Sequence, residues 1–170
     1  LELSIVLVII GLIVGGVTVG KDLIRSAELN SVISDINRYK IATNAFKLKY
    51  NQLAGDMNNA ASYWPTDCVD EAGPPVSDCN GNGDGYIGLN GETVRFWQHL
   101  ALSNILSGSF NGIYTSATVF HDASNSAVSK LNNGIISLNY NEANGNIFFA
   151  DGRPIVNLFT FGATTTVYST

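Results

Sequence analysis

The chain has 170 residues, of which 45% are hydrophobic and only 14% are charged, whereas about 25% of the residues of a typical soluble domain are charged. Its net charge is −5, and its nine lysines and arginines are scattered along the chain. This balance argues against a surface that binds nucleic acid or an anionic membrane, and it favours an extracellular protein over a cytosolic one.

The first twenty residues form an apolar segment. No charged residue lies between Leu3 and Gly20, and 18 residues of α-helix extend ~27 Å, close to the ~30 Å hydrocarbon core of a bilayer. Glu2 places one carboxylate at the start of this segment, and an unpaired carboxylate entering hydrocarbon costs at least ~2.5 kcal/mol. The basic start and small-residue cleavage site of a secretory signal peptide are not found here. We therefore expect a membrane-spanning helix whose carboxylate needs a cationic partner.

The helical pattern continues without a polar linker from Lys21 to Leu53. Residues at heptad spacing fall on two adjacent lines of this helix: Leu29, Ile36, Thr43 and Tyr50 on one, and Val32, Tyr39, Phe46 and Leu53 on the other. Such a stripe can be covered by one head domain. We predict a single helix over residues 1–53, ~75 Å long, which stops near Gly55 because a glycine just past the last periodic residue is a common helix end.

The N-terminal sequence Leu-Glu-Leu-Ser-Ile-Val-Leu-Val-Ile-Ile-Gly-Leu resembles that of the type IV pilin superfamily, which includes the pseudopilins of type II secretion. The resemblance is confined to roughly the first 25 residues. In that family the mature chain begins with a methylated aromatic residue, a glutamate follows shortly after, and the apolar helices bundle into the filament core. The resemblance implies that Leu1 and Glu2 serve in assembly. We expect Glu2 to neutralise the N-terminal ammonium of a neighbouring subunit.

One departure from the family concerns helix flexibility. Val19 occupies the place where many pilins carry a helix-breaking proline. Each glycine costs ~1 kcal/mol of helix stability relative to alanine, so we expect any bend or local melting at the glycines of the apolar segment: Gly11, Gly15, Gly16 and Gly20.

Residues 54–170 are expected to form a globular extracellular head. Its first part, the loop 57–91, is rich in Gly, Pro, Asn and Asp, and structureless loops of that length are uncommon in compact domains. With few apolar residues to bury, the loop should be held by other ties. The first is a disulfide between Cys68 and Cys79, the two cysteines of the chain, which is expected to stabilise the head by ~2–3 kcal/mol.

The second expected tie is a Ca²⁺ ion. Oxygen-bearing side chains alternate with glycine in Asn80-Gly-Asn82-Gly-Asp84-Gly-Tyr86, which resembles the front of an EF-hand calcium loop. The predicted ligands are Asn80, Asn82, Asp84, the Tyr86 carbonyl and Glu92, with Asp78 as a possible substitute. The glutamate comes one residue later than the strict pattern requires, and a Gly-Asn turn cluster without metal is the alternative.

The rest of the head is predicted as one helix followed by strands. A helical pattern begins at Glu92, includes Ile105 and meets a stop signal at Gly108. On this helix Phe96 and Trp97 should pack against the long helix, and His99 is expected at the surface. Alternating segments predict four or five antiparallel strands at 114–120, 135–140, 146–150, 155–161 and 164–168. The predicted fold class is therefore α+β and type IV pilin-like, one long helix packed on an antiparallel sheet with a disulfide-tied loop.

No catalytic motif is present in the sequence, so an enzyme is not expected. The interpretation is a structural subunit that is held in the bacterial inner membrane as a precursor, passes through a pilus or secretion assembly machinery and packs as a homo-oligomer into an extracellular helical filament. The alternatives are a type II secretion pseudopilin, a pilus-associated adhesin or binding module, and a membrane-anchored domain that never polymerises.

Overall fold

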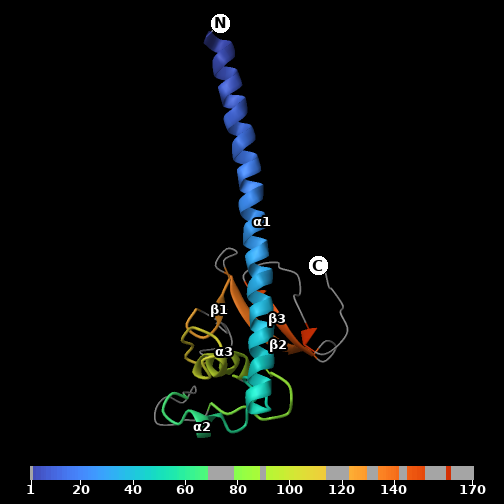
Figure 1. The fold of residues 1–170 in the computed structure, drawn as a ribbon, viewed down its shortest axis with the longest axis vertical. Helices are drawn as coiled ribbons and strands as arrows, with labels where there is room; N and C mark the ends of the chain where they lie inside the picture. The colour runs from blue at the N-terminus through green and yellow to red at the C-terminus, as the bar shows by residue number, and fades with distance from the viewer. Residues whose placement is uncertain are drawn as a thin grey trace.

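In the computed structural model one long helix projects from a smaller head (Figure 1). The structure describes residues 2–68, 79–88, 91–113, 123–129, 134–141, 145–151 and 160–161. Their elements are three helices, α1 (Glu2–Tyr50), α2 (Ala60–Tyr63) and α3 (Glu92–Leu102), and four strands, β1 (Ala127–Val128), β2 (Ile135–Asn141), β3 (Gly145–Asp151) and β4 (Thr160–Phe161). The predicted α+β class with one long N-terminal helix is confirmed.

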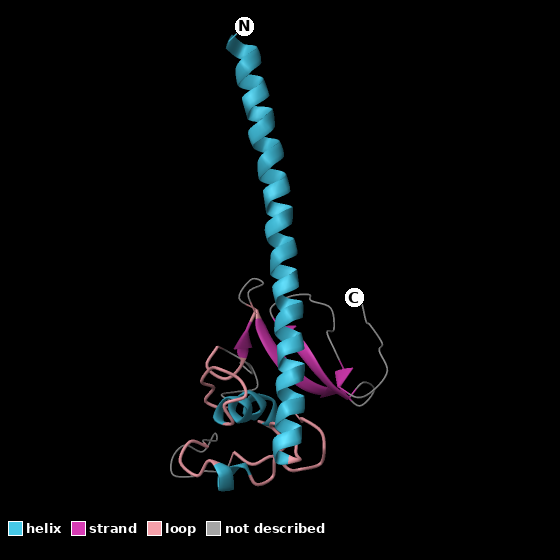
Figure 2. Ribbon diagram, viewed as in Figure 1, coloured by secondary structure: helices cyan, strands magenta, loops and turns pink. Residues whose placement is uncertain are grey.

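Helix α1 runs without interruption for 49 residues, about 74 Å at 1.5 Å per residue. The predicted stripe on its rear part is largely confirmed, because the side chains that are buried against the head share one face: Val32, Ile36, Tyr39, Ala42, Thr43 and Phe46. Leu29 departs from the stripe and is 43% exposed. The head therefore covers the helix only from about Val32 onwards, and the part before it projects free (Figure 2).

The predicted end of α1 near Gly55 is wrong, because the helix ends at Tyr50. Asn51 takes a left-handed conformation with φ 56°, and its N–H donates to the Lys47 carbonyl at 2.8 Å. This is the αL motif that ends many helices, and asparagine tolerates it better than most residues. Leu53, expected on the helical stripe, therefore lies in the turn that follows.

Helix α3 also ends earlier than predicted, at Leu102 rather than near Gly108. Asn104 is left-handed with φ 58°, its N–H donates to Ala101, and the Ile105 N–H donates to Leu100 at 3.2 Å. These two bonds form a Schellman motif. Before that end the predicted packing of Trp97 on the long helix is confirmed, since its ring meets Tyr39 edge-on.

The sheet is antiparallel with the strand order β1-β2-β3-β4. Its centre is the β2–β3 hairpin, in register from Ile135 opposite Asp151 to Asn141 opposite Gly145, which confirms the strands predicted at 135–140 and 146–150. Ile136 and Leu138 are buried, as expected for alternate residues on one strand face. Of the strand predicted at 155–161 the structure describes residues 160–161, paired as β4. The strands predicted at 114–120 and 164–168 lie outside the described residues.

The loop 57–91 differs from the expectation in one respect. The predicted disulfide between Cys68 and Cys79 is formed, but the loop also contributes its own apolar side chains to the core. Met57 and Ile87 are almost completely buried, and α2 lies within the loop. Burial therefore helps the disulfide to hold this segment, although so few apolar residues were not expected to hold it by burial alone.

Candidate functional site

The front segment of α1, residues 3–20, is exposed on every side, with only Gly20 half-buried. Its large aliphatic side chains are between 49% and 81% exposed, and no described residue of the head covers them. The Thr18 hydroxyl donates to the Val14 and Gly15 carbonyls, so this hydroxyl is satisfied within the helix. Among the described residues, α1 is the one helix with the length and hydropathy that crossing a membrane requires. Exposed apolar surface of this extent marks a surface that is covered by lipid or by protein.

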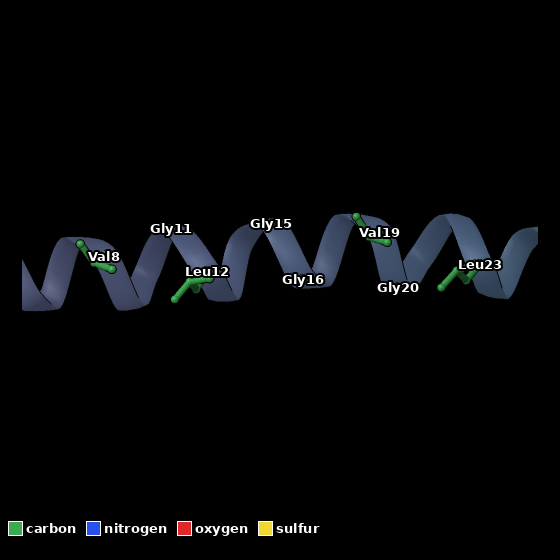
Figure 3. Close-up of a pocket in the computed structure, with 8 residues that line it drawn as sticks. All are labelled: Val8, Gly11, Leu12, Gly15, Gly16, Val19, Gly20 and Leu23. Atoms are coloured by element: carbon green, nitrogen blue, oxygen red, sulfur yellow. The ribbon is translucent and has the colours of Figure 1, made fainter.

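A shallow open groove runs along one side of this segment (Figure 3). Glycines leave its floor open, since a Cβ at any of the four predicted flexible positions meets no heavy atom within 4 Å, while aliphatic side chains stand beside them. The lining residues are Val8, Gly11, Leu12, Gly15, Gly16, Val19, Gly20 and Leu23. In the free chain these glycines do not interrupt the helix. Glu2 begins α1, and Leu1 lies outside the described residues.

A second candidate site is built around the carboxylate of Asp56, which the sequence reasoning missed. Asp56 is buried and accepts three backbone hydrogen bonds: the N–H groups of Gly83 and Asp84 donate to Oδ1 at 2.7 and 3.1 Å, and that of Gly85 donates to Oδ2 at 2.8 Å. Successive N–H groups that converge on one anion form a nest. Asp56 therefore holds the turn 83–85 from the far side of the loop.

Glu92 holds the same loop from the first turn of α3. Its Oε1 accepts the Asn82 N–H at 3.0 Å and its Oε2 accepts the Gly88 N–H at 2.7 Å. A carboxylate in the first turn also benefits from the positive end of the helix dipole. We call Asp56 and Glu92 together the carboxylate clamp. Its two carboxylates fix five backbone N–H groups of residues 82–88.

Burial raises the pKa of both clamp carboxyls above the ordinary values. The backbone N–H donors oppose this rise, whereas repulsion from Asp84 adds to it for Asp56, and repulsion from Asp56 and Asp84 adds to it for Glu92. Three carboxylates thus act on one another across a short stretch of loop. The electrostatic potential in this region is negative, and a bound cation would reduce the repulsion between the carboxylates.

The predicted calcium ligands lie in this region, and their side-chain oxygens already accept N–H groups. Asn80 Oδ1 accepts from Ala61, Asn82 Oδ1 from Asp84, and Asp84 Oδ1 from Tyr86. Because a carbonyl or carboxylate oxygen has two lone pairs, it can also bind a cation. Among the described residues, no three carboxylate, histidine or cysteine side chains are arranged to hold a metal ion. Asp78 lies outside the described residues, and calcium binding stays a prediction.

His99 is the second residue that the sequence reasoning misplaced, because it is fully buried rather than at the surface. Its Nδ1 accepts the Gly55 N–H at 2.9 Å, and its Nε2 lies 3.0 Å from the Cys79 carbonyl oxygen. A carbonyl can only accept, so Nε2 carries the proton and the ring is neutral. The sequence signals for both missed residues were indirect: a glycine-rich turn needs an acceptor for its N–H groups, and a lone histidine at helical spacing can face the core.

Comparison of the chain with protein-family models, with curated proteins and with solved structures gave no match.

Proposed function

We propose that this chain is a structural subunit of the type IV pilin kind, which is held in a membrane by the front segment of α1 and polymerises through that segment into an extracellular filament. The observation that carries the proposal is the division of one unbroken helix into two parts. The front segment is exposed on all sides, whereas the rear part buries one face in the head. A subunit whose apolar segment passes from lipid to a bundle of like helices needs this arrangement.

The resemblance of the N-terminal residues to the pilin superfamily supports the same proposal. Glu2 stands at the beginning of α1, immediately before the uncharged segment, where a carboxylate needs a cation to offset its desolvation. The N-terminal ammonium of a neighbouring subunit supplies such a cation in a bundle of parallel helices. In this scheme the head stays at the filament surface, where the disulfide and the carboxylate clamp keep its loop rigid.

The test is negative-stain imaging of material sheared from cells that produce the chain at its natural level. A pilin gives abundant long filaments, whereas a type II secretion pseudopilin or a single-copy adhesin does not. Glu2→Leu should leave the chain in the membrane fraction but reduce filament yield at least tenfold. The matched control is Glu28→Leu, which removes a carboxylate from the same helix outside the front segment and should leave filaments intact. Parental filament yield from Glu2→Leu cells would contradict the role of this carboxylate.

A further inference from the structure

The ring of His99 joins three segments that are far apart in the sequence. It belongs to α3, it accepts the N–H of Gly55 in the turn after α1, and it donates to the carbonyl of Cys79 at one end of the disulfide. Aromatic rings flank it: the Phe46 ring lies nearly parallel to it, with ring centroids 6.1 Å apart, and the Trp64 ring centroid is 5.8 Å away.

The hydrogen bond from Gly55 depends on the neutral ring, whereas Nε2–H can donate to the Cys79 carbonyl in either protonation state. A second proton on the imidazole would go to Nδ1, which would then present a donor to the Gly55 N–H, itself a donor. The charged ring would also lie in an apolar site where no anion of the described residues is available to pair with it. The charged group that acts on it, Arg95 of α3, is positive and opposes its protonation. From α1 and the loop the ring is faced by Phe46, Trp64, the Gly55 backbone and the disulfide-bonded Cys79, none of which titrates.

Gly55 shows that this arrangement is closely fitted. Its φ is +87°, and a Cβ there would collide with the Glu92 carbonyl. The N–H that His99 accepts is therefore held in one direction by a backbone that other residues cannot adopt without strain. A protonated Nδ1 would need an acceptor, and the Gly55 N–H, which is a donor, cannot serve as one.

We propose that His99 is an acid-responsive latch of the head: when neutral it fastens the Cys79 end of the disulfide to the turn after α1, and when protonated it releases this connection. The change in hydrogen bonding does not depend on the proposed function, whereas its use outside the cell rests on the extracellular location proposed above. A protein exposed to the external medium meets a wider range of pH than a cytosolic one. The latch would keep the disulfide loop ordered at neutral pH and let it become less ordered in acid.

The direction and the pH range of the change in head stability follow from the difference in proton binding between the folded and unfolded states. Burial lowers the pKa of His99 from its ordinary value of 6.5 to about 4. Below pH 6.5 the unfolded chain binds a proton that the folded head binds only near pH 4. The contribution is therefore fully present above pH 6.5, is lost as the pH falls from 6.5 to 4, and changes no further below that. Since each pKa unit is a tenfold change, the folding equilibrium constant falls on the order of 100-fold over this window.

The first test is a ¹⁵N NMR titration of the imidazole in the full chain, kept in detergent micelles. His121, the other histidine of the chain, is replaced in a His121→Gln variant so that one ring remains. The expected result is the Nε2–H tautomer of His99, neutral down to pH 5, with a Gly55 amide signal that shifts when the ring protonates. Titration of His99 near pH 6.5, or the Nδ1–H tautomer, would overturn the proposal. Because His99 is not mutated in this test, the result cannot be attributed to misfolding of a His99 variant.

The second test compares urea unfolding of the full chain and of His99→Gln between pH 7 and pH 4, followed by tryptophan fluorescence. Glutamine keeps a donor for Cys79 but does not titrate. The ratio of the folding equilibrium constants of the parent and of His99→Gln should fall on the order of 100-fold between pH 7 and pH 4. The stability of His121→Gln should depend on pH as that of the parent does. The raised pKa values of Asp56 and Glu92 favour the folded state as the pH falls, and this opposite effect cancels in the comparison. A constant difference across the range would show that His99 packs without sensing pH.

Discussion

Tyr39 of α1 meets Trp97 of α3 edge-on, with ring centroids 4.8 Å apart and ring planes at 84°. Both side chains are buried, and the Trp97 ring also contacts Phe96 and Phe110. This contact joins the long helix α1 to helix α3 of the head. We expect Trp97→Ala to lower the free energy of unfolding by ~3–5 kcal/mol, because the loss of so large a ring leaves a cavity that the head cannot fill. Urea unfolding of the full chain in detergent, followed by Trp64 fluorescence, measures this change.

The matched control for Trp97→Ala is Leu48→Ala on α1. Leu48 is 88% exposed, so truncating it should change the free energy of unfolding by no more than ~0.5 kcal/mol. Equal destabilisation by the two variants would contradict the placement of the core between α1 and α3.

The carboxylate clamp gives a second prediction. Asp56→Ala removes the acceptor of three part-buried hydrogen bonds from backbone N–H groups, and a hydrogen bond to a charged group contributes ~1.5–3 kcal/mol. We expect a loss of several kcal/mol in head stability and much faster hydrogen exchange at Gly83 and Gly85. Asp67→Ala is the control, because Asp67 is exposed and its hydrogen bond is to the adjacent Thr66. If exchange at Gly83 and Gly85 were unchanged in Asp56→Ala, the clamp would not hold the turn.

Sequence patterns predicted the long helix, the buried stripe, the β2–β3 hairpin and the disulfide, because each rests on local periodicity or on a pair of residues. The helix ends were misplaced for a local reason. Asn51 and Asn104 both adopt positive φ, and each ends its helix several residues before the glycine that looked like the stop signal. Asparagine has no strong preference between helix and left-handed turn until its surroundings are known.

Asp56 and His99 could not be predicted because their partners are distant. Asp56 accepts from residues 27 to 29 positions further along the chain, and His99 contacts Gly55 and Cys79, which are 44 and 20 positions away. The sequence around either residue gives only an indirect signal that it is buried. The pattern behind the predicted calcium loop is visible in the sequence for the opposite reason, since its oxygen-bearing residues alternate with glycines within one short segment. Sequence alone could not show that the side-chain oxygens of Asn80, Asn82 and Asp84 already accept N–H groups.

The glycines of the front segment give a third prediction. A Cβ at Gly15 meets no atom within 4 Å in the free chain, so Gly15→Ala should fold normally and stabilise the helix by ~1 kcal/mol. If assembly requires local loss of helicity there, the variant should form fewer filaments although its membrane insertion is unchanged. A density map of the parental filament should then show broken helical hydrogen bonds between Gly11 and Gly20. An unbroken helix in the filament from Leu3 through Asn30 would contradict this prediction.

The last prediction concerns calcium. Asp56, Asp84 and Glu92 repel one another. A divalent cation bound by Asp84, Glu92, the Tyr86 carbonyl and the amide oxygens of Asn80 and Asn82 would remove that repulsion. Extracellular calcium modules have dissociation constants of ~10⁻⁴–10⁻³ M, so the site would be filled outside the cell. We expect added Ca²⁺ to raise the melting temperature of the full chain in detergent, and a chelator to reverse the rise.

Asp84→Ala separates a metal site from a hydrogen-bonded turn. Asp84 also accepts the Tyr86 N–H and receives a bond from the Asn82 amide, so its removal destabilises the loop whether or not an ion binds. The informative quantity is therefore the difference in melting temperature with and without Ca²⁺, which should vanish in Asp84→Ala and persist in Asp67→Ala. A parental chain that melts at the same temperature in Ca²⁺ and in chelator would leave the carboxylate clamp and the disulfide as sufficient to order residues 79–88, since together they bind that segment at both of its ends.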